Sequence, residues 1–252
     1  MFLEKICLYT TLVCFFIIKP AHAAGDSCHP EIDTSKKQYI VGYGSLISER
    51  SKQATVLDTG PSIPIEVRGF KRGWFHLVKN HIYLGVEMDE NQFLNGVLFS
   101  LGNKQDLKKF DKREIDYCRV SVPRNKIVAL SDDKVDGQFW IYVTQQIRNK
   151  DEFAKTKGVA ASYMYTFLLG CKEVADKFSL QDYLHKCTNQ TSDWPSVIDY
   201  DLDNRDKLLK SRIVPKDDEL KEINKLLCYR VPPKTMLPKS GELPFLQADS
   251  EL

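Results

Sequence analysis

Two short stretches of the chain contain residue types that could do chemistry. The first is residues 39–48, YIVGYGSLIS, in which strand-forming residues give way to Tyr43, Gly44 and Ser45. Glycine permits a sharp turn and lets a ligand approach the backbone, so consecutive N–H groups there can face an anion. The stretch predicts a strand that ends in a loop whose amides could hold a carboxylate or an oxyanion. An ordinary turn is the simpler interpretation of the same pattern.

The second stretch is FDKREIDYCRVSV, where a charged cluster joins the end of a predicted helix to a strand. Glu114 falls at this junction. Phe110 and Tyr117 flank it and could remove it partly from water, which raises a carboxyl pKa and allows proton transfer near neutral pH. We expect Asp111 and Asp116 to face solvent instead. A fully solvated helix end is the alternative.

Other kinds of site find little support in the sequence. Ser45 is a poor candidate for a nucleophile, because Y-G-S-L lacks the G-x-S-x-G pattern and no histidine is evidently placed to activate it. The histidines lack metal-binding spacing and no CxxC occurs, so we expect no metal site. A net charge of +2 in 252 residues, without a basic patch, argues against a nucleic-acid partner. The histidines are His22, His29, His76, His81 and His185.

The N-terminus has the pattern of a signal peptide. An apolar run at 6–18 follows Lys5, and A-H-A at 21–23 then offers a cleavage site of the A-x-A type. The run is shorter than the roughly twenty residues that a membrane-spanning helix needs. We therefore expect an exported protein, periplasmic or secreted, whose mature chain begins at Ala24 and has no membrane anchor.

Export would place the remaining cysteines in an oxidising compartment, where disulfides form and persist. The number of cysteines after the predicted signal peptide is odd, so we expect at most two bridges and at least one unpaired thiol. Cys118 is the expected free thiol, because it lies in a predicted strand, where free cysteine packs as a small apolar residue. The cysteines concerned are Cys28, Cys118, Cys171, Cys187 and Cys228.

The first half of the chain consists of short runs rich in β-branched and aromatic residues, separated by Gly, Asn, Asp and Pro. One short helix, at 103–113, interrupts them, and Asn103 is its expected N-cap. Parallel βαβ units would need a helix after each strand, so this order predicts an α+β fold built on a small, partly closed mixed β-barrel. The predicted strands are 38–43, 63–69, 72–79, 82–88, 94–101, 117–122 and 138–144.

The second half is predicted to be helical and to form a C-terminal helical extension. Apolar residues recur near a 3.6-residue period at 151–170. Ser179 to Asp182 resembles a capping box that opens a helix to about 187, and a last helix is expected at 217–228. The predicted division of the chain is a signal peptide at 1–23, a lead-in at 24–37, a domain at 38–190, the helical extension at 191–230 and a Pro-rich tail at 231–252.

Several motifs, taken in order over residues 38–190, resemble the gamma-glutamylcyclotransferase family. Leu46 after Y-G-S is similar to the glutathione-degrading, ChaC-like branch, whereas the vertebrate-type enzymes have Asn at that place. The motifs are Tyr43-Gly44-Ser45-Leu46, Arg68 to Trp74 (RGFKRGW), Leu94 to Phe99 (LNGVLF), Asp111 to Arg119 (DKREIDYCR), and Ser162-Tyr163 with Leu169 to Glu173 (LGCKE).

This resemblance implies a gamma-glutamylcyclotransferase fold and a cofactor-free activity. The substrate would be a small gamma-glutamyl peptide or amine, glutathione among them, which closes to 5-oxoproline and releases the amine. The alternative is an exported module of the same fold that binds gamma-glutamyl or similar carboxylate ligands without turnover. The site residues that the resemblance implies are Glu114 as general acid and base, and Tyr43, Gly44, Ser45, Leu46 and Tyr163 against the substrate.

Intact mass spectrometry of the protein recovered outside the cytoplasm tests the export prediction. We expect a chain that begins at Ala24, because A-H-A is the most credible cleavage site in the sequence. Retention of residues 1–23 would contradict the prediction, and so would a lipid attached to Cys14.

Overall fold

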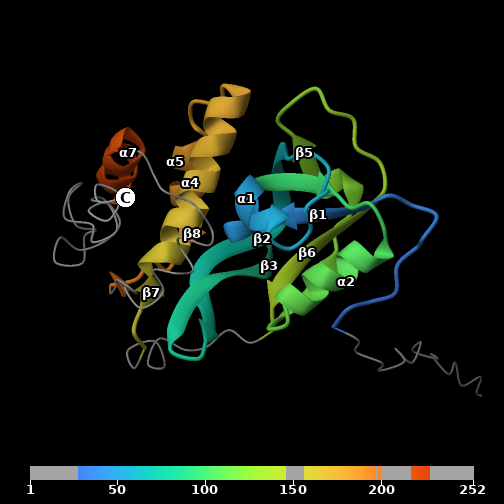
Figure 1. Cartoon of the computed structure of the whole chain (residues 1–252), viewed down its shortest axis with the longest axis horizontal. Coiled ribbons are helices and arrows are strands. Elements are labelled where there is room, and N and C mark those ends of the chain that lie inside the picture. The colour runs from blue at the N-terminus through green and yellow to red at the C-terminus, as the bar shows by residue number, and fades with distance from the viewer. Residues whose placement is uncertain (1–27, 146–155, 197, 200–216, 228–252) are drawn as a thin grey trace, which may run out of the picture.

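The computed structural model of the protein describes residues 28–145, 156–196, 198–199 and 217–227, and Figure 1 shows how they are arranged. The predicted signal peptide and the Pro-rich tail lie outside these residues. Among the described residues, no helix is long and apolar enough to cross a membrane. Strands and helices alternate irregularly along the chain, so the molecule has the α+β class that the sequence predicts.

A mixed sheet of nine strands forms the centre of the molecule. Its six principal strands are β1 (Gln38–Gly42), β2 (Ile63–Val78), β3 (His81–Ser100), β4 (Tyr117–Ser121), β5 (Ile127–Ala129) and β6 (Gln138–Thr144). They follow the order β4-β6-β1-β3-β2-β5, in which β1 and β6 are parallel and the other neighbours antiparallel. In the part of the chain that is described, β4 and β5 end this path without pairing with each other. The barrel is therefore only partly closed, as predicted.

The hairpin of β2 and β3 contains two strands where the sequence predicts four. Gly69 has φ +85° and carries the chain through a bulge, so the first strand continues where a break is expected. Glycine accepts this conformation without steric cost. Register shifts between Arg68 and Phe70 and between Trp74 and His76 mark the irregular places, and such bulges bend a hairpin. Two short strands add to the same hairpin, β7 (Val159–Ala160) beside β3 and β8 (Thr191–Ser192) beside β2, and β9 (Ile198–Asp199) pairs with β7.

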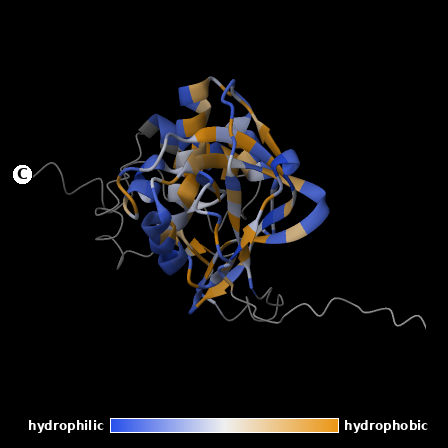
Figure 2. Cartoon of the chain, turned by 90° about the vertical axis from the view of Figure 1, so that its right-hand side faces the viewer, coloured by the Kyte–Doolittle hydropathy of each residue, from blue (hydrophilic) through white to orange (hydrophobic). Residues whose placement is uncertain are grey.

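Both faces of the central strands are buried. Successive side chains of a strand point to opposite faces of the sheet. In β1, Ile40 packs into a core cluster shared with the helices, while Tyr39 and Val41 pack into a second cluster formed mainly by strand residues. Figure 2 shows the apolar residues in the middle of the molecule and hydrophilic residues toward its outside. Burial on both faces explains why β1 is a continuous apolar run in the sequence.

Helices cover the sheet and connect its strands. In Figure 1, α4 (Ala161–Phe178) lies between the sheet and α7 (Asp217–Leu227), and α5 (Tyr183–Asn189) packs beside α4. The 3-10 turn η1 (Ser45–Ile47) and the short helix α1 (Glu49–Gln53) follow β1, and a second 3-10 turn, η2 (Arg124–Lys126), precedes β5. The remaining helix is α2 (Lys104–Arg113), which leads from β3 toward β4.

The N-cap predicted for α2 is confirmed. The side-chain oxygen of Asn103 accepts hydrogen bonds from the backbone N–H groups of Gln105 at 2.8 Å and Asp106 at 3.1 Å. Such a cap satisfies donors that have no partner within the helix. The start of α2 is therefore specified locally.

The boundaries predicted for α4 are wrong. The helix begins at Ala161 and passes through Gly170 to Phe178, whereas the expected range is 151–170, of which 151–155 lie outside the described residues. Gly170 does not end the helix. It lets α4 approach the loop after β1, because a Cβ at this position would lie 2.6 Å from the backbone nitrogen of Ser48.

The predicted capping box at Ser179 is also wrong. Ser179 adopts a left-handed conformation, with φ 54°, and ends α4. The next helix, α5, begins at Tyr183, and the side chain of Asp182 makes no capping hydrogen bond. A residue in the left-handed region is a common way for a helix to end, and it redirects the chain here.

Two disulfides are present in the described residues, Cys28–Cys118 and Cys171–Cys187, with sequence separations of 90 and 16 residues. The expectation that Cys118 is a free thiol is wrong. The lead-in runs beside β4, where the backbone N–H of Arg119 donates to the carbonyl of Cys28 at 2.8 Å and the two Cα atoms approach to 4.6 Å. Cys228 lies outside the described residues.

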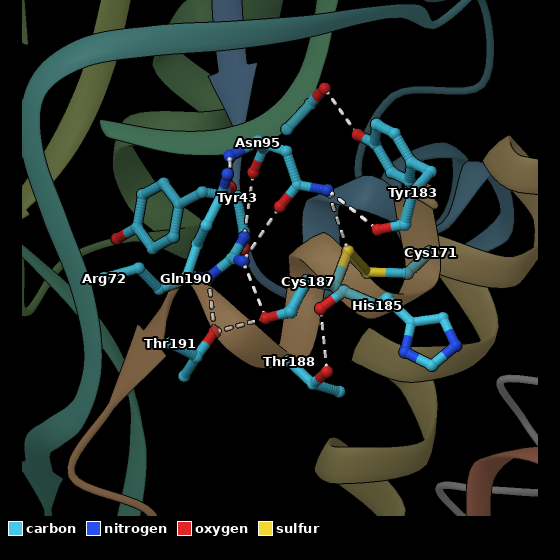
Figure 3. Close-up of a disulfide and its surroundings, with 11 residues drawn as sticks. Tyr43, Arg72, Asn95, Cys171, Tyr183, His185, Cys187, Thr188, Gln190 and Thr191 are labelled. Atoms are coloured by element: carbon cyan, nitrogen blue, oxygen red, sulfur yellow. Dashed lines mark hydrogen bonds between the residues drawn. A yellow bond between two sulfur atoms is a disulfide. The ribbon is translucent and has the colours of Figure 1, made fainter. Parts of the chain in front are cut away.

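The side chain of Arg72 is completely buried where β2, β3, the loop after β1 and the segment after α5 meet (Figure 3). A guanidinium has five N–H donors, and all five have acceptors here. Nε donates to Thr191 Oγ1 at 2.8 Å. Nη1 donates to the carbonyls of Tyr43 at 3.0 Å and Asn95 at 2.8 Å. Nη2 donates to Asn95 Oδ1 at 3.0 Å and to the carbonyl of Cys187 at 2.9 Å.

The charge of Arg72 is therefore compensated by neutral oxygens. Burial lowers the pKa of its guanidinium to about 10, which still leaves it protonated at neutral pH. Asn95 extends the network, since its Nδ2 donates to the carbonyl of Tyr183 at 3.1 Å. Phe167 of α4 covers the guanidinium carbon, with 5.0 Å between that atom and the ring centroid. One side chain thus joins three strands, two helices and the loop of Tyr43.

Replacing Arg72 with Met should be strongly destabilising, because the change leaves several buried acceptors without donors. We expect the free energy of unfolding, measured by urea denaturation, to fall by about 3–5 kcal/mol. Arg68→Met is the matched control, since Arg68 lies on the same strand but is exposed, and its effect should stay within about 0.5 kcal/mol. Two variants of equal stability would contradict the role given to Arg72.

Candidate active site

The loop that follows β1 is held by contacts from β6 and β2. Beyond Gly42 the chain turns through Tyr43 and Gly44 into η1. The Tyr43 hydroxyl donates to the carbonyl of Tyr142 at 2.7 Å, while the Tyr43 carbonyl accepts the hydrogen bond from Arg72. The loop is therefore fixed through both its side chain and its backbone before any ligand arrives.

Glu114 is the residue at which α2 ends and the chain turns toward β4, as the sequence predicts. Its backbone N–H donates to the carbonyl of Phe110 at 2.8 Å, which closes the last turn of the helix. Its side chain is only 16% exposed, and its Oε1 lies 3.1 Å from Nε of Arg113. Burial raises the pKa of the Glu114 carboxyl, and the charge and hydrogen bond of Arg113 oppose part of this rise. A raised pKa suits a carboxyl that exchanges protons near neutral pH.

Tyr163 reaches the loop from the first turn of α4. Its ring stands edge-on to the rings of Trp74 and Tyr83, at centroid distances of 6.0 and 4.9 Å. Its hydroxyl is hydrogen-bonded to the backbone of Ser45, and a Cβ placed on Gly44 would lie 2.9 Å from the hydroxyl oxygen. The missing side chain of Gly44 therefore leaves the space into which the Tyr163 hydroxyl fits.

The six residues singled out in the sequence lie together in one small pocket. The space inside it that the centre of a water molecule can occupy is about 20 Å³, which is close to the room for a single water. Any larger ligand requires a side chain to move. The pocket is lined by Tyr43, Gly44, Ser45, Leu46, Glu114 and Tyr163, together with Leu84, Tyr117 and Tyr142.

The tyrosines of the pocket differ in what their hydroxyls contact. Tyr117 donates to the carbonyl of Leu84 at 2.9 Å and Tyr142 donates to Asp111 Oδ1 at 2.8 Å, so these two, like Tyr43, are directed to acceptors of the protein. Tyr163 is the tyrosine whose hydroxyl meets the loop backbone. Burial raises the pKa of all four phenols, which makes them neutral donors at physiological pH.

The expectation that Asp111 faces solvent is wrong. Its side chain is 17% exposed, and Oδ1 accepts hydrogen bonds from Nε of Arg119 at 2.9 Å and from the Tyr142 hydroxyl at 2.8 Å. Asp111 lies in the last turn of α2 on the side that meets β4 and β6. Asp116, in contrast, is exposed as expected.

Arg113 and Tyr142 are site residues that sequence reasoning missed. Tyr142 lies in β6, whose central residues are buried on both faces, so alternation along this strand gives no sign of which residue lines a pocket. Arg113 stands in a run of charged residues that has the appearance of a solvated helix end. Its partners Ser45 and Ser51 lie more than sixty residues earlier in the chain, so no local sequence pattern predicts these contacts.

Nucleophilic and metal-dependent sites are not assembled in the described part of the chain. The Ser45 hydroxyl accepts a hydrogen bond from Arg113 at 3.1 Å, and no histidine lines the pocket. Among the same residues, no group of three or more His, Cys, Asp and Glu side chains could hold a metal ion. The ionisable side chains that line this pocket are the largely buried carboxyl of Glu114 and four phenols.

Comparison with known proteins gives structural likenesses at low identity. No family model and no curated protein matches the chain. One solved structure that resembles it is named gamma-glutamyl cyclotransferase, with a TM-score of 0.49, 13% identity, and coverage of 69% of this chain and 99% of that one. A human uncharacterised protein resembles the chain with a TM-score of 0.48 and 14% identity, and the match covers 68% of this chain and 99% of that one. A yeast gamma-glutamyl cyclotransferase specific to glutathione has a TM-score of 0.41 and 12% identity, and the match covers 62% of this chain and 97% of that one. Likeness at this level does not assign an activity to the chain.

The backbone of the loop should matter more than the Ser45 side chain. Gly44→Val places methyl groups where the Tyr163 hydroxyl lies and should abolish ligand binding while the sheet still folds. Ser45→Ala should be milder. Calorimetric titration with glutathione, performed in a Glu114→Gln background to prevent turnover, measures both effects.

The matched control for this experiment is Gly102→Val, because Gly102 lies outside the pocket and a Cβ there meets only the carboxylate of Asp106, at 3.3 Å. This control should bind glutathione like the parent. If Ser45→Ala were as damaging as Gly44→Val, a covalent role for the serine would replace the role given to the backbone.

Proposed function

We propose that the protein is a gamma-glutamylcyclotransferase, which cyclises the gamma-glutamyl group of a small peptide or amine to 5-oxoproline and releases the amine. One observation carries the proposal: a largely buried carboxyl, Glu114, shares a small pocket with the backbone loop around Gly44. The motifs that resemble this family supply the same residues in the same order along the chain. The two lines of support are independent, since the motifs are local and the pocket depends on the fold.

The reaction needs little covalent chemistry from the protein. The α-amino nitrogen of the gamma-glutamyl group attacks its own side-chain carbonyl carbon, a new C–N bond closes a five-membered lactam, and the C–N bond to the leaving amine breaks. Because the attack is intramolecular, holding the substrate in a folded conformation supplies much of the acceleration. Three tyrosines of the pocket, Tyr43, Tyr117 and Tyr142, are held by hydrogen bonds to the protein and could serve as fixed walls against which the substrate folds.

Proton movement is the part that requires an ionisable group. The α-ammonium group must lose a proton before it can attack, and the leaving amine must gain one before it departs. In the proposal Glu114 performs both transfers, first as base and then as acid. The proton that the carboxyl takes from the α-ammonium group is the one that it gives to the leaving amine. A carboxyl in water is too weak a base for this role, and the burial of Glu114 favours it by raising its pKa.

The loop supplies the other half of the proposed site. Backbone N–H groups near Gly44 and Ser45 would hold the α-carboxylate or the oxyanion that develops on the attacked carbonyl, where a fixed donor contributes a few kcal/mol. In the ligand-free pocket the Tyr163 hydroxyl is bonded to the Ser45 backbone. A gamma-glutamyl group is larger than the space now present, so we expect the Tyr163 side chain to rotate and to bond to the ligand instead.

A binding module without catalysis is the alternative, and Glu114 separates the two. A module that only holds a carboxylate ligand gains nothing from a buried carboxyl, because like charges repel and the burial itself is costly. Glutamine would serve a binder as well. The presence of a glutamate in this pocket therefore favours an enzyme.

We further propose that the protein is exported and acts in an oxidising compartment. The signal-peptide pattern at 1–23 supports this, and the disulfides Cys28–Cys118 and Cys171–Cys187 add a second argument, because such bridges are rare in reducing compartments. The substrates it meets would then be the gamma-glutamyl compounds outside the cytoplasm.

Glu114→Gln should lose turnover and keep the fold. The amide preserves shape and hydrogen bonding but cannot exchange protons, so 5-oxoproline release should fall about a hundredfold or more. Asp116→Asn is the matched control, because it neutralises an exposed carboxylate two residues away and should retain most of the activity. Both variants are compared with wild type by chromatography of 5-oxoproline, with thermal melts to show folding. Near wild-type turnover by Glu114→Gln would exclude the proposed mechanism.

A further inference from the structure

We propose that Arg113 is a positioning residue of this site, a clamp that holds Ser45 of the loop and Glu114 in one fixed arrangement. The inference rests on the proposed function and extends it to a residue that neither the motifs nor the chemistry requires.

Four N–H donors of Arg113 make hydrogen bonds within the protein, and the remaining nitrogen, Nε, forms an ion pair with Glu114. Nε lies 3.1 Å from Oε1 of Glu114. Nη1 donates to the carbonyl of Ser51 at 2.6 Å and to Oγ1 of Thr55 at 2.7 Å. Nη2 donates to Oγ of Ser51 at 2.9 Å and to Oγ of Ser45 at 3.1 Å. Both terminal nitrogens of Arg113 are thus engaged by the protein and Nε faces Glu114, so this side chain acts on the site through Ser45 and Glu114.

The clamp connects two parts of the chain that meet only in the folded protein. Arg113 is the last residue of α2, while its serine partners precede it by 68 and 62 residues, in η1 and α1. A planar fork with fixed N–H directions holds such partners at one distance and one angle. The arrangement therefore sets where the carboxyl of Glu114 lies relative to the loop, and a shift of about 1 Å there can reduce turnover about a hundredfold.

Arg113 also determines the electrostatic surroundings of Glu114. Burial raises the pKa of that carboxyl, and Arg113 is the charged group that opposes the rise. The other titratable groups that line the pocket come from the loop, β4, β6 and α4 and are phenols whose pKa is raised by burial, so they stay neutral while Glu114 titrates. These phenols are Tyr43, Tyr117, Tyr142 and Tyr163.

The two functions of Arg113 are separable by substitution. Arg113→Gln removes both the charge and the fork, whereas Arg113→Lys keeps the charge on a single nitrogen that cannot contact Glu114, Ser45 and Thr55 together. Lys112→Gln is the matched control, since it removes the same charge from the neighbouring residue, which is exposed.

The pH dependence of kcat/KM for 5-oxoproline formation distinguishes these variants. A base must be ionised, so activity rises with pH through the pKa of Glu114. Loss of the Arg113 charge raises that pKa, so the acid limb of Arg113→Gln should move to higher pH by about one unit, together with a loss of kcat of tenfold or more. Arg113→Lys should have a lower kcat, while the acid limb of its pH profile stays near the wild-type position. Lys112→Gln should match wild type in both kcat and the position of the acid limb.

A second measurement does not depend on turnover. The side-chain carboxyl of Glu114, labelled with carbon-13 and assigned by its disappearance in Glu114→Gln, is titrated by NMR in wild type, Arg113→Gln and Arg113→Lys. We expect a higher midpoint in Arg113→Gln than in wild type. Equal midpoints and unchanged kcat would overturn the role of Arg113 even if the enzyme cyclises gamma-glutamyl compounds.

The NMR result also separates this inference from the proposed function. If no gamma-glutamyl compound is turned over but the midpoint rises in Arg113→Gln, the contact of Arg113 with Glu114 stands and the proposed reaction fails. If Arg113→Gln does not fold, Arg113→Lys decides the matter. In Arg113→Lys, a lower kcat with an unshifted midpoint of the Glu114 titration supports the positioning role of Arg113. A wild-type kcat in this variant overturns that role.

Discussion

The buried guanidinium of Arg72 is the interaction on which the rest of the structure depends. A charge that is fully removed from water is costly unless every donor is satisfied, and five hydrogen bonds to neutral oxygens meet that demand here. Those acceptors belong to four separate segments, so the requirement to satisfy one side chain fixes β2 and β3 against the loop of Tyr43 and the segment after α5. The Cys171–Cys187 bridge stands beside this network and ties α5 to α4 (Figure 3).

The candidate site inherits its rigidity from this arrangement. Arg72 holds the carbonyl of Tyr43, and the loop beyond it then passes under α4, where Gly170 allows close approach of the helix. Arg113 also binds the loop through a guanidinium, with four hydrogen bonds and an ion pair to Glu114. The two arginines differ in one respect: Arg72 has no carboxylate among its hydrogen-bond partners, whereas Arg113 contacts Glu114 and so affects an ionisable group. Arg72 holds the backbone of the loop at Tyr43, and Arg113 connects the loop at Ser45 to Glu114, the proposed acid–base residue.

The sequence predicts those parts of the fold that depend on neighbouring residues. Asn103 signals the start of α2 because its side chain caps the backbone N–H groups two and three residues later. The observed bounds of β6 coincide with the predicted range, because a run of aromatic and β-branched residues favours a strand. The place of Glu114 follows from local information too, since the apolar pattern of the helix ends at Phe110 and only charged residues follow up to Glu114.

Features that depend on distant contacts could not be predicted. Cys118 was an expected free thiol because nothing local indicates that the lead-in returns to β4. Gly69 looks like a break between strands, and only the pairing of β2 with β3 on both sides of it makes it a bulge. The buried acceptors of Arg72 and Arg113 lie far from them in the chain, so a single sequence gives these two arginines the appearance of ordinary surface charges.

The most direct measurement of the central claim is identification of the products that the wild-type mature protein forms from glutathione and from a panel of gamma-glutamyl amides. The account predicts 5-oxoproline and the free amine in equal amounts, because the α-amino group of the substrate is the nucleophile. Free glutamate in place of 5-oxoproline would mean that water is the nucleophile and would contradict the account. Saturable binding of these compounds with neither product would contradict it as well and would identify the protein as a binding module.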